Sequence, residues 1–181
     1  MSRWRTPNSA HDPESMSEGE SRSHQEKVPK RGSMDNSEIV SQTAKIAASA
    51  ATTDELLRAA VSLLRENRPY YNWVGIYLLD GGFLTLHNYV GKPTEHSRIA
   101  VGTGVCGAAV ADRENKIVGD VTAIENYLAC SVETRSEIVV LIRRGEVILG
   151  QIDIDSNHKD AFTVADEELL SGVAEILAEK L

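Results

Sequence analysis

The sequence predicts an α+β domain in which antiparallel strands lie between helices. Three observations lead to this class. Apolar residues recur with a helical period over residues 37–67 and again from Thr163 onward. Between these segments lie two pairs of runs rich in β-branched and aromatic residues, and a short glycine turn joins each pair. This order favours a sheet with helices on one face and a ligand pocket on the other.

The first and last helices have the clearest sequence signals. Residues 37–67 read as two helices, or as one helix interrupted near Ala51, and Thr52-Thr53-Asp54-Glu55 has the form of a capping box. Pro69 ends this segment. The remaining elements are expected in this order: strands 72–79 and 83–90, a polar loop 91–103, a helix 104–113, a short strand 116–119, a loop 120–136, strands 138–143 and 147–155, and a helix from Thr163 to the end of the chain.

The first 36 residues differ in composition from the rest. Residues 1–36 are rich in Ser, Glu, Arg and Pro and poor in aliphatic side chains, so they are predicted to be a disordered tail before a single domain at 37–181. The tail carries six basic and six acidic residues, so the formal net charge of −8 belongs to the domain. This acidity argues against binding to nucleic acid.

No part of the sequence predicts a membrane partner. The sequence has no apolar run long enough for a membrane span and no apolar signal region near its start. We therefore expect a cytoplasmic protein. In that reducing compartment its two cysteines are expected to be thiols or a transient redox pair.

The two cysteines are the first candidates for chemistry. Cys130 lies in a polar loop before a strand, where exposure favours a reactive thiolate, although an incidental loop cysteine fits the pattern equally well. Cys106 lies between glycines at a predicted helix N-terminus, where the helix dipole favours a thiolate, but packing of a small side chain is the commoner explanation. Neither has a CxxC partner, so no zinc site, other metal or cofactor is predicted.

Three carboxylates form a second group of candidates. Asp153 and Asp155 lie two residues apart on a predicted strand, so they share a face with Gln151. Glu137 begins the strand before it. Such carboxylates could bind a cationic amine or hold a proton for acid catalysis. They could equally lie on a solvated sheet face.

Two aromatic residues complete the set of candidates. Trp73 and Tyr77 lie four residues apart on the first strand and share one face. They could form the aromatic wall of a pocket, although core packing is the commoner use of such residues. The spacing of His87 and His96 does not indicate metal ligands.

In combination, four segments of the chain resemble the free methionine-(R)-sulfoxide reductases, which are single GAF-domain enzymes. The likeness covers roughly residues 40–181. The segments are Asn72 to Tyr77, Gly104 to Gly107, Tyr127 to Cys130 with Ser136 to Val140, and Gly150 to Ser156. The resemblance implies a GAF fold with a central antiparallel sheet of about six strands. It also implies a small pocket for free, not peptide-bound, methionine sulfoxide.

The resemblance further implies roles for the candidate residues. Cys130 takes the position of the nucleophile, whose sulfenic acid a second thiol converts to a disulfide. The three carboxylates take the positions that hold the amine and assist the sulfoxide oxygen. Trp73 and Tyr77 form the wall around the sulfur and its methyl group. A thioredoxin-type reductant is the expected electron donor. The long N-terminal helix favours a homodimer, because such helices often join GAF domains.

One position departs from the family pattern. A third cysteine, ten residues before Cys106, is replaced here by His96. If the missing cysteine is the resolving one, Cys106 or a small thiol must replace it. The alternative interpretation is therefore a non-catalytic GAF module that binds a ligand or senses redox state and acts through a partner.

Overall fold

The computed structural model describes residues 33–124 and 133–181. Most of the predicted tail, residues 1–32, lies outside these ranges, so the tail and the boundary at residue 37 stay predictions. The described elements are α1 Asn36–Ser49, α2 Thr53–Asn67, β1 Trp73–Asp80, β2 Phe83–Val90, β3 Arg98–Ala100, α3 Gly104–Asp112, β4 Lys116–Val118, the 3-10 turn η1 Val121–Ala123, β5 Ser136–Arg144, β6 Val147–Ser156 and α4 Val164–Ala178. Within these two ranges no helix combines the length and the hydropathy that a bilayer span requires.

A six-stranded antiparallel sheet forms the centre of the domain. Its strand order is β3-β2-β1-β6-β5-β4, so the hairpins β1–β2 and β5–β6 lie side by side and join through β1 and β6. This arrangement confirms the predicted α+β class and the expected number of strands. Strand β6 lies inside the sheet, with β1 on one side and β5 on the other.

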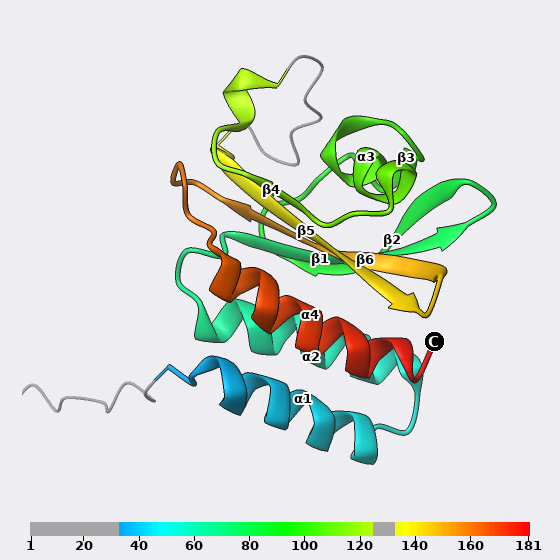
Figure 1. Cartoon of the computed structure of the whole chain (residues 1–181). Coiled ribbons are helices and arrows are strands. Elements are labelled where there is room, and N and C mark those ends of the chain that lie inside the picture. Colours follow the sequence, from blue (N-terminus) through cyan, green and yellow to red (C-terminus); the bar gives the residue numbers. More distant parts are fainter. Residues whose placement is uncertain (1–32, 125–132) are drawn as a thin grey trace, which may run out of the picture. The chain divides into compact units, whose positions relative to one another are not determined.

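The long helices α1, α2 and α4 lie on one side of the sheet (Figure 1). Helices α2 and α4 pack on the strands, and α1 packs on α4 and α2 as an outer layer. Because side chains alternate along a strand, one set from the sheet joins the apolar stripes of these helices in a single core. Burial of this apolar surface is the main favourable term in folding. The strand residues in this core include Val74, Ile76, Ile138, Val140, Ile152 and Ile154.

Helix α3 lies on the opposite side of the sheet, where the sequence predicts the pocket (Figure 1). It contacts β5, β6 and β3. The alternate side chains of the strands meet it in a second buried cluster that contains Trp73, Tyr77, Cys106 and Val139. The pocket face therefore has a helix of its own, and that helix carries one of the two cysteines.

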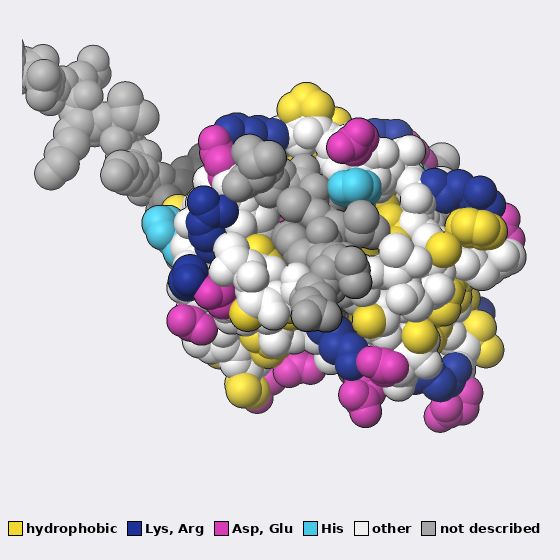
Figure 2. Space-filling model, turned by 90° about the horizontal axis from the view of Figure 1, so that it is seen from above, with side chains coloured by type: hydrophobic (Ala, Val, Ile, Leu, Met, Phe, Trp, Pro, Cys, Tyr) yellow, Lys and Arg dark blue, Asp and Glu magenta, His cyan; other side chains and the backbone are white. Residues whose placement is uncertain are grey.

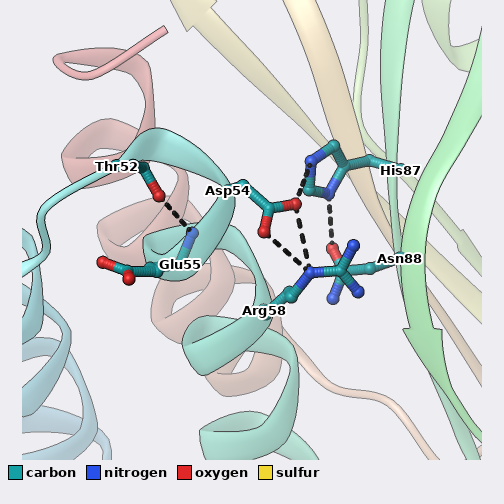
Figure 3. A network of polar contacts seen from close by, with 6 residues as sticks. All are labelled: Thr52, Asp54, Glu55, Arg58, His87 and Asn88. Atoms are coloured by element: carbon teal, nitrogen blue, oxygen red, sulfur yellow. Dashed lines mark hydrogen bonds and ion pairs between the residues drawn. The ribbon is translucent and has the colours of Figure 1, made fainter.

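The break predicted near Ala51 separates α1 from α2. Thr52 caps α2, because its hydroxyl oxygen accepts a hydrogen bond from the backbone N–H of Glu55 at 3.2 Å (Figure 3). The Glu55 carboxylate accepts a hydrogen bond from the backbone N–H of Ala51 at 2.9 Å, one residue further back than a standard capping box requires. The predicted capping box thus has its N-cap hydrogen bond, and its second hydrogen bond comes from Ala51 in place of Thr52.

Two short elements lie within segments predicted to be loops. Strand β3 falls inside the expected loop 91–103 and pairs with the outer edge of β2. Its central residue, Ile99, is buried in the α3-side cluster. A strand of this length has too few residues to show alternation, so its sequence gives no β signal. The turn η1 lies within the loop expected at 120–136.

Candidate active site

Strands β1, β6 and β5 place their α3-side residues in three rows. Residues directly opposite one another in a sheet have neighbouring side chains. Strand β6 is the middle member of each row, because it pairs with β1 on one side and β5 on the other. The rows are Trp73–Asp155–Glu137, Gly75–Asp153–Val139 and Tyr77–Gln151–Leu141. The structure thus brings together all the candidate residues predicted from the strands.

The three carboxylates in these rows are buried. The exposed fraction is 4% for Glu137, 0% for Asp153 and 1% for Asp155. This burial excludes the solvated sheet face that the sequence pattern also allows. Carboxylates shielded from water need hydrogen bonds, protons or a bound cation. The middle of the sheet is therefore suited to a cationic group or to proton transfer.

Cys106 adds a thiol to this polar centre from the first turn of α3. The Cys106 Sγ atom donates a hydrogen bond to Glu137 Oε1 at 3.8 Å. The sulfur and one oxygen each of Glu137 and Asp153 lie within 4.8 Å of one another. Cys106 is 5% exposed and also packs in the apolar cluster, as the packing interpretation expects, and its role as a reactive thiolate stays a prediction. Three donors are one fewer than the four protein ligands of a structural zinc site.

Asp153 has a strongly perturbed acidity. Its pKa lies well above the usual aspartate value, because burial disfavours the charged form and the neighbouring charge of Asp155 adds to the effect. Hydrogen bonds with Cys106 and Glu137 act in the opposite direction. A carboxyl group of this kind keeps its proton to a higher pH than an exposed aspartate does, which favours its use as a general acid.

Trp73 forms an aromatic wall that lies across the second row. A Cβ atom built on Gly75 would lie 2.2 Å from the indole, and one on Gly91 would lie 2.4 Å from it. Both glycines therefore make room for this ring. The indole stacks on Tyr89 at 5.4 Å between ring centroids, and its Nε1 donates a hydrogen bond to the carbonyl oxygen of Lys92 at 3.2 Å.

Tyr77 lies in the third row beside this wall. Its ring centroid is 6.4 Å from that of Trp73, and it is fully buried. Its hydroxyl donates a hydrogen bond to the carbonyl oxygen of His96 at 2.8 Å. His96, which replaces the third cysteine of the family pattern, thus contacts the aromatic wall through its main chain.

A pocket of about 300 Å³ opens beside the first row. Trp73 and Asp155 form part of its lining. Around it, the Glu133 carboxylate accepts hydrogen bonds from the Lys92 ammonium at 2.5 Å and from the Asn157 amide at 3.3 Å. This volume is at the small end of the range for ligand pockets. The full lining is Arg65, Asn72, Trp73, Gly91, Lys92, Glu133, Thr134, Asp155 and Asn157.

The sequence analysis missed the polar groups around this pocket. Lys92, Glu133, Thr134 and Asn157 lie outside the strands and far apart in the sequence, so no spacing connects them. Single polar residues in loops carry no signal of their own. Cys130 lies outside the described residues, between Ile124 and Glu133, and its place relative to the three rows stays a prediction.

Comparison with known proteins assigns this fold to one family. Residues 50–181 match the GAF domain family, and the chain belongs to that family. The free methionine-R-sulfoxide reductase of Escherichia coli (strain K12) is 37% identical over 118 residues, which cover 65% of this chain and 69% of that protein. Protein YtsP of Bacillus subtilis (strain 168) is 39% identical over 124 residues, which cover 67% of this chain and 76% of that protein.

A solved structure extends this relationship to the fold. The free methionine-R-sulfoxide reductase from Neisseria meningitidis, solved in complex with its substrate, is 33% identical, with a TM-score of 0.75. The match covers 80% of this chain and 87% of that one. The protein is therefore a GAF domain related to the free methionine-R-sulfoxide reductases, as the four sequence segments indicate.

Proposed function

We propose that this protein reduces free L-methionine (R)-S-oxide to methionine. One observation carries the proposal. The Cys106 thiol and the carboxyl groups of Glu137 and Asp153 lie within 4.8 Å of one another, on a buried sheet face with an aromatic wall. These groups can supply electrons, an amine contact and a proton to one small ligand. The similarity to reductases of that name supports the same substrate.

In this proposal each row of residues contacts a different part of the substrate. Asp155 and Glu137 of the first row pair with the α-amino group. The Trp73 indole, which lies over the second row, packs on the sulfur and its methyl group. Tyr77 extends that wall into the third row. Asp153, whose pKa is raised by burial, donates its proton to the sulfoxide oxygen. A peptide-bound residue has no free amine for the first row, so the free amino acid is the substrate.

Cys130 is the proposed nucleophile. Its thiolate attacks the sulfoxide sulfur, and the oxygen, protonated by Asp153, moves from that sulfur to the sulfur of Cys130. The substrate sulfur–oxygen bond is thereby broken, methionine leaves, and Cys130 becomes a sulfenic acid. The Cys106 thiol then attacks that sulfur and water leaves, so a disulfide forms. A thioredoxin-type dithiol reduces the disulfide by exchange. In total, the sulfoxide and two thiols give methionine, one disulfide and water.

Cys106 is proposed as the resolving thiol because His96 occupies the position of the third family cysteine. The chain has two cysteines, so an internal disulfide can only join Cys106 and Cys130. We further propose that the protein acts as a cytoplasmic homodimer. Light scattering on the purified full chain measures its mass and tests the dimer directly.

A coupled assay tests the proposed activity. NADPH oxidation is followed with thioredoxin, thioredoxin reductase and each sulfoxide epimer of free methionine, for the wild type and for Cys130→Ser. We expect steady turnover of the R epimer alone, abolished by the substitution. N-acetylmethionine sulfoxide is the control for a blocked amine and should not react. A wild type that binds the sulfoxide but does not turn over, even with dithiothreitol, would support the non-catalytic GAF module instead.

A further inference from the structure

Gln151 is a polar residue on the α3-side face of the sheet that the proposed mechanism does not use. Its side chain is fully buried, in the middle strand of the sheet. Within the described structure, neither its amide nitrogen Nε2 nor its amide oxygen Oε1 has a hydrogen-bond partner. Native proteins rarely bury both ends of an amide in this way, and such groups require an explanation. A ligand that supplies the missing hydrogen bond is one explanation.

The location of Gln151 shows which part of a ligand it can meet. It lies in the third row, between Tyr77 and Leu141. The Tyr77 hydroxyl donates its hydrogen bond to the His96 carbonyl, and Leu141 has no polar side-chain atom. Gln151 and Asp153 lie two positions apart on β6, a distance of about 7 Å along the strand. A ligand atom that lies between these two side chains would therefore be within reach of both.

The polar side chains along β6 are carboxyl groups in the first two rows and an amide in the third. Asp155 and Asp153 are carboxyl groups, whereas Gln151 is a neutral amide with two N–H donors. If the substrate amine lies at the first row and the sulfur lies under Trp73 at the second, the sulfoxide oxygen lies toward the third. A sulfoxide oxygen can accept two hydrogen bonds. Asp153 supplies one donor from the second row, and the amide can supply another.

We propose that Gln151 Nε2 donates a hydrogen bond to the sulfoxide oxygen and makes the pocket prefer the sulfoxide to the thioether product. This inference rests on the proposed substrate. A thioether sulfur is only a weak acceptor, so methionine leaves the buried amide without a strong partner. A site built to hydrogen-bond a ligand group discriminates against the analogue that lacks it, because the buried protein group is left unpaired. The same contact therefore favours release of the product.

Binding measurements without turnover test the inference. In the full chain carrying Cys130→Ser, titration calorimetry compares free methionine (R)-S-oxide with methionine. We expect the sulfoxide to bind at least about tenfold more tightly than methionine, and Gln151→Leu to reduce that ratio of affinities, with the Asp153 hydrogen bond accounting for what remains. The affinity for methionine should stay the same or increase. Leu141→Met, in the same row, is the matched control and should keep the preference. Gln151→Met serves as a second variant, with the same expectation, if Gln151→Leu does not fold.

Thermal unfolding separates this role from a structural one. Removing a buried amide that has no partner should leave Tm unchanged or raise it. A lower Tm together with equal weakening of both ligands would overturn the inference and assign Gln151 to the core. A ratio of sulfoxide to methionine affinity that is the same in both Gln151 variants as in the parent would overturn the inference alone. A parent that binds neither ligand would overturn the proposed substrate as well, so the two failures are distinguishable.

Discussion

Asp153 is a carboxyl group that water cannot solvate in the folded protein. Its folded pKa lies above the unfolded value of 3.8, so the native state holds the proton more tightly. The contribution of Asp153 to stability is therefore fully present below about pH 3.8 and is lost as the pH rises through the folded pKa. Asp153→Asn should raise Tm at neutral pH by about 3 °C, the shift that roughly 1 kcal/mol causes in a domain of this size.

Thermal scans between about pH 4 and about pH 7 check this expectation. The difference in Tm between Asp153→Asn and wild type should widen as the pH rises. Glu66→Gln, an exposed carboxylate on α2, is the control and should show no such trend. A difference that narrows with rising pH would mean that Asp153 is stabilised as the anion. The same substitution should abolish sulfoxide reduction, because it removes the proposed proton donor.

Gly75 makes room for the indole that forms the pocket wall. An alanine Cβ there would lie 2.2, 2.5 and 3.2 Å from three atoms of the six-membered ring of Trp73. Gly75→Ala should therefore destabilise the protein by about 1–3 kcal/mol in urea unfolding, as overpacking of a filled core does. Trp73→Phe removes the ring atoms in question. A double-mutant cycle should then show that the alanine costs much less in the Trp73→Phe background, and an equal cost would refute the clash.

At the residue scale, the sequence predicts which strand residues share the face of the site. It does not predict which residues of other elements contact them. Alternation along β6 is enough to place Asp153 and Asp155 on one face. Their burial depends on α3, and the contact between Cys106 and Glu137 joins residues 31 positions apart. Such contacts follow from strand register and helix placement. Local patterns do not determine either of them.

At the element scale, Asp166 connects the start of α4 to the segment before β1. One carboxylate oxygen accepts hydrogen bonds from the hydroxyls of Tyr70 at 2.6 Å and Tyr71 at 2.8 Å. The other accepts from the backbone N–H and the hydroxyl of Thr163, both at 2.9 Å. Burial alone would raise the pKa of Asp166, but these hydrogen bonds outweigh it and lower the pKa. The hydrogen bonds that the two tyrosine hydroxyls donate in turn depend on the ionised form of this carboxylate.

Asp166→Ala should destabilise the domain by about 2 kcal/mol at neutral pH, because it leaves the buried Tyr71 hydroxyl and the half-buried Tyr70 hydroxyl without their acceptor. Since the folded pKa is depressed, the contribution is present above the unfolded value of 3.8 and is lost as the pH falls through the folded pKa. Urea unfolding at several pH values measures both effects. Glu168→Ala, exposed in the same turn of α4, is the control. If the difference in the free energy of unfolding between Asp166→Ala and wild type stays constant toward low pH, Asp166 does not stabilise the fold as an ionised carboxylate.

Asp54 also connects two elements, α2 and β2, but unlike Asp166 it does so at the surface (Figure 3). Asp54 pairs with Arg58 at 2.9 Å in its own helix and with His87 of β2 at 3.2 Å. Arg58 and Asp54 are more than half exposed, so solvent screens their attraction. Asp54→Asn should lower Tm by no more than about 2 °C in a thermal scan. A loss as large as that of Asp166→Ala would show that this network has a structural role.

Sequence reasoning is most successful at the element scale, where a segment is long enough to repeat its pattern. The span predicted for β2, residues 83–90, equals the observed strand, and Thr163 is the N-cap of α4 as expected. Strand β3 has three residues and forms because β2 offers an open edge to residues 98–100. Strand β3 exists because it pairs with β2, and the sequence of residues 98–100 does not indicate that pairing.

At the scale of the whole molecule, charge is dispersed and the thiols are few. Figure 2 shows Lys and Arg side chains interspersed with Asp and Glu around the rim of the α3 side, despite the formal net charge of −8. Ion pairs such as Lys92–Glu133 and Lys159–Asp120, both at 2.5 Å, join separate segments of the described chain. Because the sequence has two cysteines, the electron balance of the proposed reaction can be followed by counting thiols.

Thiol counting follows the electrons through that reaction. Wild type mixed with one equivalent of the R sulfoxide, without reductant, should lose two thiols when assayed after denaturation, because Cys106 resolves the sulfenic acid. Cys106→Ser should lose one thiol, form methionine once and retain a sulfenic acid that dimedone labels. Cys130→Ser should lose none. If Cys106→Ser turns over with thioredoxin at the wild-type rate, the sulfenic acid is resolved by an external thiol, and Cys106 serves the site through packing and its hydrogen bond to Glu137.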